Sequence, residues 1–290
     1  MRFSITITNY SWDISTAALV DHLADVAAAA DDAAVDTVWV ADHLLQGDPS
    51  STVEEPMLEA FTTLGYLAGR TGRVRLGTMV AAATYRAPAL LIKSVTTLDV
   101  LSRGRAWLGV GAGYHEAEAR AMGLDLPSRP DRFARLEELL RLARQMWDDD
   151  DSPFHGVHSE LERPINRPQP IHAPHPPVLI GGTGERHTLR LVAEYGDACN
   201  LFDIPDGGQT LRRKLEVLRR HCDAVGRDYD QIDRTVSTRW SLGQPAEELV
   251  AHCRSLSELG LTHAVVLREG PWTATAVEEL GRAWGDVGRR

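Results

Sequence analysis

The sequence has few cysteines and no long apolar run, and both shortages narrow what the chain can be. Its 290 residues include only Cys199, Cys222 and Cys253, with no CxxC pair. Such spacing does not support a disulfide framework and fits a reducing compartment. No segment approaches the ~20 consecutive apolar residues of a membrane span, and the initial MRFSITITNYSWD carries no cleavable targeting signature. We therefore expect a cytoplasmic protein that does not bind membranes.

Basic residues are also scarce, with 31 Lys and Arg against 41 Asp and Glu, a formal net charge of −10. This balance argues against a general nucleic-acid binder. No GxSxG or Walker A motif is present, which removes the commonest hydrolase and nucleotide-triphosphatase interpretations. The pairs His155/His158 and His172/His175 lie in a proline-rich loop without zinc-ligand spacing, so no metal is expected.

What the chain does contain is a regular alternation of strand-like and helix-like runs. The expected strands are Arg2–Thr8, Asp36–Ala41, Arg73–Val80, Arg105–Val110, Pro177–Gly182, Asp197–Phe202, Asp233–Trp240 and Thr262–Leu267. The expected helices are Thr16–Ala33, Glu55–Thr71, Pro88–Leu101, Glu116–Met122, Arg132–Trp147, Glu185–Tyr195, Gln209–Val225, Ala246–Leu259 and Ala274–Val287. Eight short apolar strands, each followed by a helix, predict an α/β fold, a (β/α)8 TIM barrel, as a single domain over residues 1–290. One irregular segment, about 151–176, interrupts the pattern.

Two glycine-rich loops follow strands of this expected barrel. GVGAG (Gly109 to Gly113) has GxGxG spacing rather than the GxGxxG of a dinucleotide site, but its glycines would let a backbone approach a flat ring. GGTG (Gly181 to Gly184) precedes a helix expected to start at Glu185. The NH groups of such a start can bind a phosphate. The alternative interpretation is a tight turn that requires glycine.

The sequence ADH places Asp42 and His43 at the end of the second strand. In a parallel barrel this end carries the active site, and an imidazole beside a carboxylate can donate or accept a proton there. The alternative is that Asp42 caps a turn and His43 packs. The residues alone leave both interpretations open.

Taken together, three stretches resemble the bacterial luciferase-like flavin and deazaflavin oxidoreductases, particularly the actinobacterial branch that uses coenzyme F420. They are DTVWVADH, TGRVRLGTMVAAATYRAPALLIKSVTTLDVLSRGRAWLGVGAGYHEAEARAMG and PPVLIGGTGERHTLRLVAEYGDACN, and they cover over half of the chain in matching order.

The resemblance implies a barrel whose tricyclic cofactor ring lies across the mouth. A non-prolyl cis peptide on the third strand, at Thr78, Met79 and Val80, would support the ring. The fourth-strand glycines, Gly111 and Gly113, would pass close to the cofactor, and the turn of Gly182, Thr183 and Gly184 would bind its phosphate. Asp42 and His43 would face the reactive edge. The segment 151–176 corresponds to a variable insertion that helps to shape the substrate pocket.

The chain departs from this family in one position. The best-known sugar-phosphate dehydrogenases of the family have a glutamate where this chain has Tyr114, which argues against a sugar-phosphate substrate and leaves Tyr114 or His115 as polar contacts.

We therefore expect an F420-dependent oxidoreductase that moves a hydride between C5 of the deazaflavin and a small organic substrate, by preference to reduce an activated C=C or C=N bond. His43 would supply or accept the proton and Asp42 would orient His43. Arg186 and Arg190 would offset the negative charge of the cofactor. The alternatives are an FMN-dependent luciferase-like monooxygenase and a non-catalytic flavin-binding barrel. A homodimer is expected.

Overall fold

A barrel of parallel strands forms the centre of the protein in the computed structural model, which describes residues 1–48 and 51–287. Nine strands form one sheet in the order β3-β2-β1-β11-β10-β9-β8-β5-β4. The third expected strand is divided into β3 (Arg75–Thr78) and β4 (Ala81–Ala82). β3 pairs with β2 (Thr37–Val40) and β4 pairs with β5 (Leu108–Gly111), so the divided strand joins the two ends of the sheet. The predicted barrel is confirmed.

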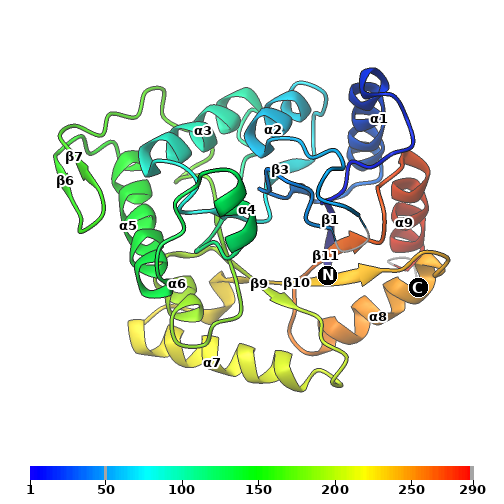
Figure 1. Cartoon of the computed structure of the whole chain (residues 1–290). Coiled ribbons are helices and arrows are strands. Elements are labelled where there is room, and N and C mark those ends of the chain that lie inside the picture. The colour runs from blue at the N-terminus through cyan, green and yellow to red at the C-terminus, as the bar shows by residue number, and fades with distance from the viewer. Residues whose placement is uncertain (49–50, 288–290) are drawn as a thin grey trace.

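Helices form a ring around the strands (Figure 1). The remaining barrel strands are β1 (Arg2–Ile7), β8 (Val178–Gly181), β9 (Ala198–Phe202), β10 (Asp233–Trp240) and β11 (His263–Arg268). The helices are α1 (Leu19–Asp32), α2 (Ala60–Ala68), α3 (Pro88–Leu101), α4 (Glu116–Ala121), α5 (Arg129–Trp147), α6 (Thr188–Tyr195), α7 (Gln209–Val225), α8 (Ala246–Glu258) and α9 (Ala274–Val287), with short 3-10 turns η1 (Thr16–Ala18) and η2 (Tyr229–Gln231). None of the described helices is long and apolar enough to cross a bilayer.

Three helices begin later than the sequence pattern predicts. Helix α1 begins at Leu19, because residues 16–18 form the 3-10 turn η1. Residues 55–59 precede α2 rather than belonging to it, because the Glu59 side chain accepts a hydrogen bond from the backbone N–H of Thr62 and so caps the helix. Helix α6 begins at Thr188, three residues after the expected start at Glu185. The GGTG turn is therefore separated from the first turn of α6 by a short non-helical stretch.

The core has two layers, one between the strands and the helices and one inside the barrel. The inner layer is a separate cluster of Trp39, Trp107, Leu179, Ala198 and Val265. Met79 and Val80 pack against it, so the interruption of the third strand lies directly on this inner core.

The segment 151–176 does not take the place that the resemblance implies. It contains a small antiparallel hairpin, β6 (Phe154–His155) and β7 (Glu160–Leu161), at the periphery of the molecule (Figure 1). It connects the end of α5 to the start of β8, so it lies at the amino-terminal face, where the Asp99 carboxylate accepts the N–H groups of Ile171 and His172 at 2.7 and 2.9 Å. The expectation that it shapes the pocket is wrong for a topological reason, since sites in such barrels lie at the opposite face.

Charged residues gather at the amino-terminal ends of the strands, around a buried histidine. The ring of His263 is 2.5 Å from the Ser4 hydroxyl, and the charged groups nearby are Arg2, Asp36, Arg75 and Asp233. Burial lowers the pKa of His263, and the attraction of Asp36 only partly opposes that shift. His263 is therefore kept neutral in the folded protein.

We predict that His263 makes the protein less stable as the pH falls. The folded-state pKa lies below the unfolded value of about 6.5, so below that pH the unfolded chain binds a proton that the native state does not. His263→Gln should flatten the loss of thermal stability between about pH 7 and pH 5. The exposed His158→Gln variant is the control, and equal pH slopes for wild type and His263→Gln would contradict the prediction.

Candidate active site

A cavity of about 280 Å³ opens among the carboxyl ends of the barrel strands. Nine of the residues singled out in the sequence line it, namely Asp42, His43, Met79, Val80, Gly113, Tyr114, His115, Gly181 and Gly182. Thr78, Gly111, Thr183 and Gly184 lie within two residues of these in the chain but are not among the lining residues. The structure therefore brings the second, third, fourth and fifth strands to one site, as the sequence predicts.

The interruption of the third strand supports one wall of this cavity. The peptide bond between Met79 and Val80 is cis, as the resemblance implies. The Thr78 hydroxyl donates a 2.6 Å hydrogen bond to the carbonyl of Gly109. A Cβ on Gly109 would lie 1.8 Å from the carbonyl oxygen of Thr78, so the two strands can approach this closely only with glycine there.

The neighbouring glycines make room for Val80. A Cβ on Gly111 would lie 3.0 Å from the Val80 side chain, and one on Gly181 would lie 2.7 Å from it. In the structure, the absence of a side chain at Gly111 leaves room for Val80 in the cavity wall. That Gly111 also lies close to the cofactor stays a prediction.

The GGTG turn keeps the geometry of a tight turn beside the cavity. Gly182 has a φ of +119°, which side-chain-bearing residues rarely adopt. Of the two expected cations, Arg186 is exposed, whereas Arg190 pairs with Glu137 and Glu194 at 2.5 and 2.6 Å. The expectation for Arg190 is therefore wrong, because two carboxylates already neutralise its guanidinium.

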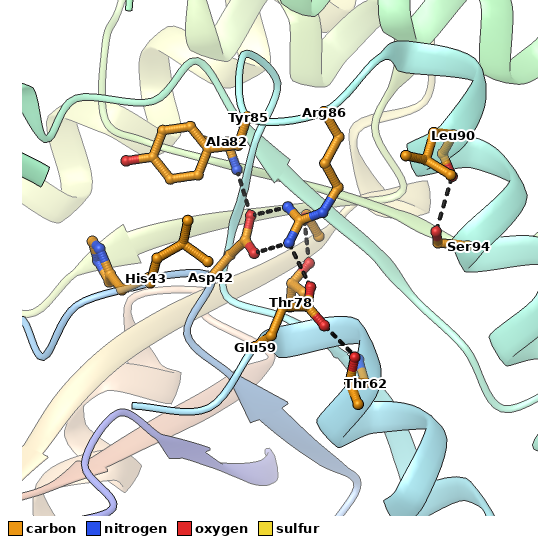
Figure 2. Close-up of polar contacts among 12 residues, drawn as sticks. Asp42, His43, Glu59, Thr62, Thr78, Ala82, Tyr85, Arg86, Leu90 and Ser94 are labelled. Carbon is orange, nitrogen blue, oxygen red and sulfur yellow. Dashed lines mark hydrogen bonds and ion pairs between the residues drawn. The ribbon is translucent and has the colours of Figure 1, made fainter. Parts of the chain in front are cut away.

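Asp42 does not contact His43 as expected. Its carboxylate forms a two-bond ion pair with Arg86 at 2.7 and 2.8 Å, and it also accepts the backbone N–H of Ala82 at 3.2 Å. Arg86 bonds Glu59 in addition, at 2.7 Å. Figure 2 shows the Asp42 carboxylate turned toward Arg86, with the ring of His43 on its other side. Burial raises the pKa of Asp42, and Arg86 opposes that rise. Asp42 thus holds β4 in place, and orienting His43 falls to another residue.

The carboxylate that contacts His43 is Glu118, in helix α4. Its Oε2 atom is 2.8 Å from Nδ1 of His43 and accepts the Tyr85 hydroxyl at 2.8 Å. Its Oε1 atom accepts the backbone N–H groups of Leu44 and Leu45 at 2.6 and 3.0 Å. The Glu118 side chain is only 1% exposed. Burial alone would raise the pKa of Glu118, but the bonds from His43, Leu45 and Tyr85 outweigh it and lower that pKa to about 2. Glu118 is therefore a carboxylate at all ordinary pH values.

Sequence reasoning missed Glu118, Tyr85 and Arg86. Glu118 lies 75 residues from His43, so no local spacing connects them. The available signal was an acidic residue in the first turn of the helix that follows GVGAG, but the same pattern also fits an ordinary exposed helix start.

Comparisons with known proteins identify related sequences. Residues 1–286 match the family model described as luciferase-like monooxygenase. An F420-dependent glucose-6-phosphate dehydrogenase of Kineococcus radiotolerans is 33% identical over 251 residues, which cover 83% of this chain and 69% of that protein.

Two solved structures share the fold. A monooxygenase from Streptomyces bottropensis has a TM-score of 0.83 at 17% identity, covering 99% of this chain and 98% of its own. An F420-dependent secondary alcohol dehydrogenase in complex with an F420-acetone adduct has a TM-score of 0.80 at 18% identity, covering 98% of both chains.

We predict that Asp42 contributes mainly to stability. Asp42→Ala leaves the Arg86 guanidinium without its two-bond partner, and breaking a buried pair in this way costs about 3–5 kcal/mol. Equilibrium denaturation in urea measures the loss. Asp32→Ala is the matched control, because the Asp32 side chain is 92% exposed beside Arg73 and such surface pairs contribute little. A fully stable Asp42→Ala protein would refute the prediction.

Proposed function

The chain belongs to the luciferase-like monooxygenase family, and from this premise we propose that it is a coenzyme F420-dependent oxidoreductase. It transfers a hydride between C5 of the deazaflavin and a small organic substrate, in the direction that reduces an activated C=C or C=N bond. The observation that carries the choice of F420 is the relative named as F420-dependent, 33% identical over 83% of this chain. The F420-dependent secondary alcohol dehydrogenase that shares the fold is consistent with it.

The residues around the cavity fit a flat cofactor ring. The volume of about 280 Å³ is close to the lower end of the range for small-molecule sites, about 300–1,000 Å³. Met79 and Val80 offer an apolar surface for one face of a ring. The buried hydroxyl of Thr6 lines the cavity and has no hydrogen-bond partner among the described residues. A buried polar group of this kind favours a ligand that satisfies it.

In our proposal, the substrate of this protein is not the sugar phosphate of the named glucose-6-phosphate dehydrogenase. Tyr114 occupies the position where the resemblance expects a glutamate in sugar-phosphate dehydrogenases, and it is 72% exposed at the cavity wall. An exposed aromatic ring favours a less polar substrate than a sugar phosphate.

His43 has the proton-transfer role in this proposal. When bound, the reduced cofactor supplies the hydride. Glu118 holds the Nδ1 side of the His43 ring, which leaves Nε2 to exchange a proton with the substrate. Asp42 has no direct part in the proton transfer in this proposal; it holds β4 in place through its bonds to Ala82 and Arg86. Gly182, Thr183 and Gly184 would present backbone N–H groups to the cofactor phosphate.

Titration with F420 and with FMN tests the proposal. Trp39 and Trp107 lie under Met79 and Val80, so a ring bound on that wall should quench tryptophan fluorescence. We expect micromolar or tighter F420 binding, much weaker FMN binding, and anaerobic oxidation of reduced F420 by an added acceptor. Stoichiometric FMN with oxygen-dependent product formation would indicate a monooxygenase instead. Cofactor binding without any turnover would indicate a non-catalytic flavin-binding barrel.

The proposed phosphate-binding role of the GGTG turn leads to a separate prediction. Gly184→Val should obstruct the approach of the phosphate and weaken F420 binding at least ~10-fold, about 1.4 kcal/mol. A deazaflavin that lacks the phosphate should bind wild type and variant equally, because it does not use the turn. Circular dichroism checks that the variant is folded. Unchanged F420 affinity in a folded variant would place the phosphate elsewhere.

A further inference from the structure

We propose that His115 is a second catalytic residue, which donates a hydrogen bond from Nε2 to the carbonyl oxygen of an α,β-unsaturated carbonyl substrate while His43 protonates the α-carbon. This rests on the proposed function and narrows its substrate class to a C=C bond conjugated to a carbonyl group.

The tautomer of His115 follows from its contact with the backbone. Its Nδ1 atom accepts the backbone N–H of Glu118 at 3.0 Å, so that His115 caps the start of α4. A backbone N–H can only donate, so Nδ1 of His115 carries no proton. In an imidazole with Nδ1 unprotonated, the proton is on Nε2. His115 therefore presents a hydrogen-bond donor at Nε2 while it caps the helix.

His43 has the opposite tautomer. Its Nδ1 atom contacts the carboxylate of Glu118 at 2.8 Å. This carboxylate is ionised, since hydrogen bonds hold the pKa of Glu118 near 2, and it can only accept. Nδ1 of His43 therefore carries a proton, and Nε2 is the atom that gains and loses one. One residue thus fixes both rings, with its backbone N–H on His115 and its side chain on His43.

The two histidines stand close enough to act on a single small group. Both line the cavity. Their ring centroids are 5.7 Å apart and their planes are inclined by 74°. Tyr114 lies beside both, at 6.1 Å from His43 and 5.9 Å from His115. Two rings this close can both contact one small substrate, and our proposal places between them the oxygen and the α-carbon of a conjugated carbonyl group, which are bonded to the same carbon.

The chemistry balances with these two residues and the hydride. The hydride adds to the β-carbon, and the electron pair of the C=C bond moves to the carbonyl oxygen as an enolate. The Nε2–H group of His115 stabilises the charge on that oxygen, as preorganised donors do in other active sites. Protonated His43 then gives its Nε2 proton to the α-carbon and takes another from solvent. The net change is the addition of one hydride and one proton to the C=C bond.

The competing explanation is that His115 only caps helix α4. His115→Asn separates the two functions, because asparagine is among the best N-cap residues but lacks the imidazole Nε2–H group. A purely structural role would be rescued by asparagine. Glu116→Gln is the matched control, an exposed change in the first turn of the same helix.

The first test reads the tautomers without any turnover. The full chain is labelled with 15N in histidine, and long-range 1H–15N spectra are recorded at about pH 8, above the ordinary histidine pKa of about 6.5. The His43→Asn and His115→Asn variants assign the two signals. We expect the proton of His115 on Nε2 and that of His43 on Nδ1. A proton on Nδ1 of His115 would overturn the proposal.

The second test measures turnover with 2-cyclohexen-1-one as the probe and reduced F420 as the hydride source, without oxygen. His115→Asn should slow oxidation of the cofactor by ~10²-fold, the usual effect of losing one such donor, with unchanged F420 affinity and helix content. Glu116→Gln should react at the wild-type rate. An Asn variant as fast as wild type overturns the role of His115.

The same experiment distinguishes the inference from the proposed function. A wild-type protein that binds F420 but leaves this enone untouched, while it reduces an imine probe, overturns the substrate class alone. A wild-type protein that does not bind F420 overturns the proposed function and the catalytic assignment with it, whatever the tautomers are.

Discussion

The reactive side of the cavity depends on one buried carboxylate, that of Glu118. It accepts hydrogen bonds from the ring of His43, from two backbone N–H groups of the loop after β2, and from the Tyr85 hydroxyl after β4. Two segments that are distant in the sequence, the loop after β2 and the one after β4, are thereby held against helix α4. A buried charge is tolerated only when such donors surround it, and here they also lower its pKa far enough to keep it ionised. The position of His43, its tautomer and the shape of the loop above the cavity follow from this one group.

The two carboxylates near His43 have different tasks, although sequence proximity suggests the reverse. Asp42 precedes His43 directly, but the two side chains leave the chain on different sides, and Asp42 pairs with Arg86 and Ala82. It thereby fixes the segment that follows the cis peptide of the third strand. Glu118 is remote in sequence yet touches the ring. One carboxylate therefore supports the wall on which a cofactor would rest, and the other supports the residue that would move a proton.

Much of this arrangement is predictable from the sequence, and the predictions that were wrong failed for physical reasons. The alternating pattern places all eight strands, and it gives α3, α7 and α9 with their observed bounds. Pro88 marks the start of α3, and burial of one face leaves a strong local period in α7 and α9. Family resemblance locates the cis peptide at Met79 and Val80. The partner of His43 and the neutralisation of Arg190 by Glu137 are contacts over 75 and 53 residues, which no local pattern encodes. The place of the segment 151–176 follows from topology, since this segment precedes strand β8 and therefore lies at the amino-terminal end of the barrel.

A double-mutant cycle in single-turnover oxidation of reduced F420 tests most directly whether Glu118 acts on the reaction through His43. The cycle compares Glu118→Gln, His43→Asn and the double variant, with cofactor affinity and thermal stability measured for each. Our account predicts that Glu118→Gln slows the wild type by ~10-fold or more, the scale of an impaired general acid, and has no further effect once His43 is replaced. Slowing by the same factor in both backgrounds would contradict it and show that Glu118 acts independently of His43.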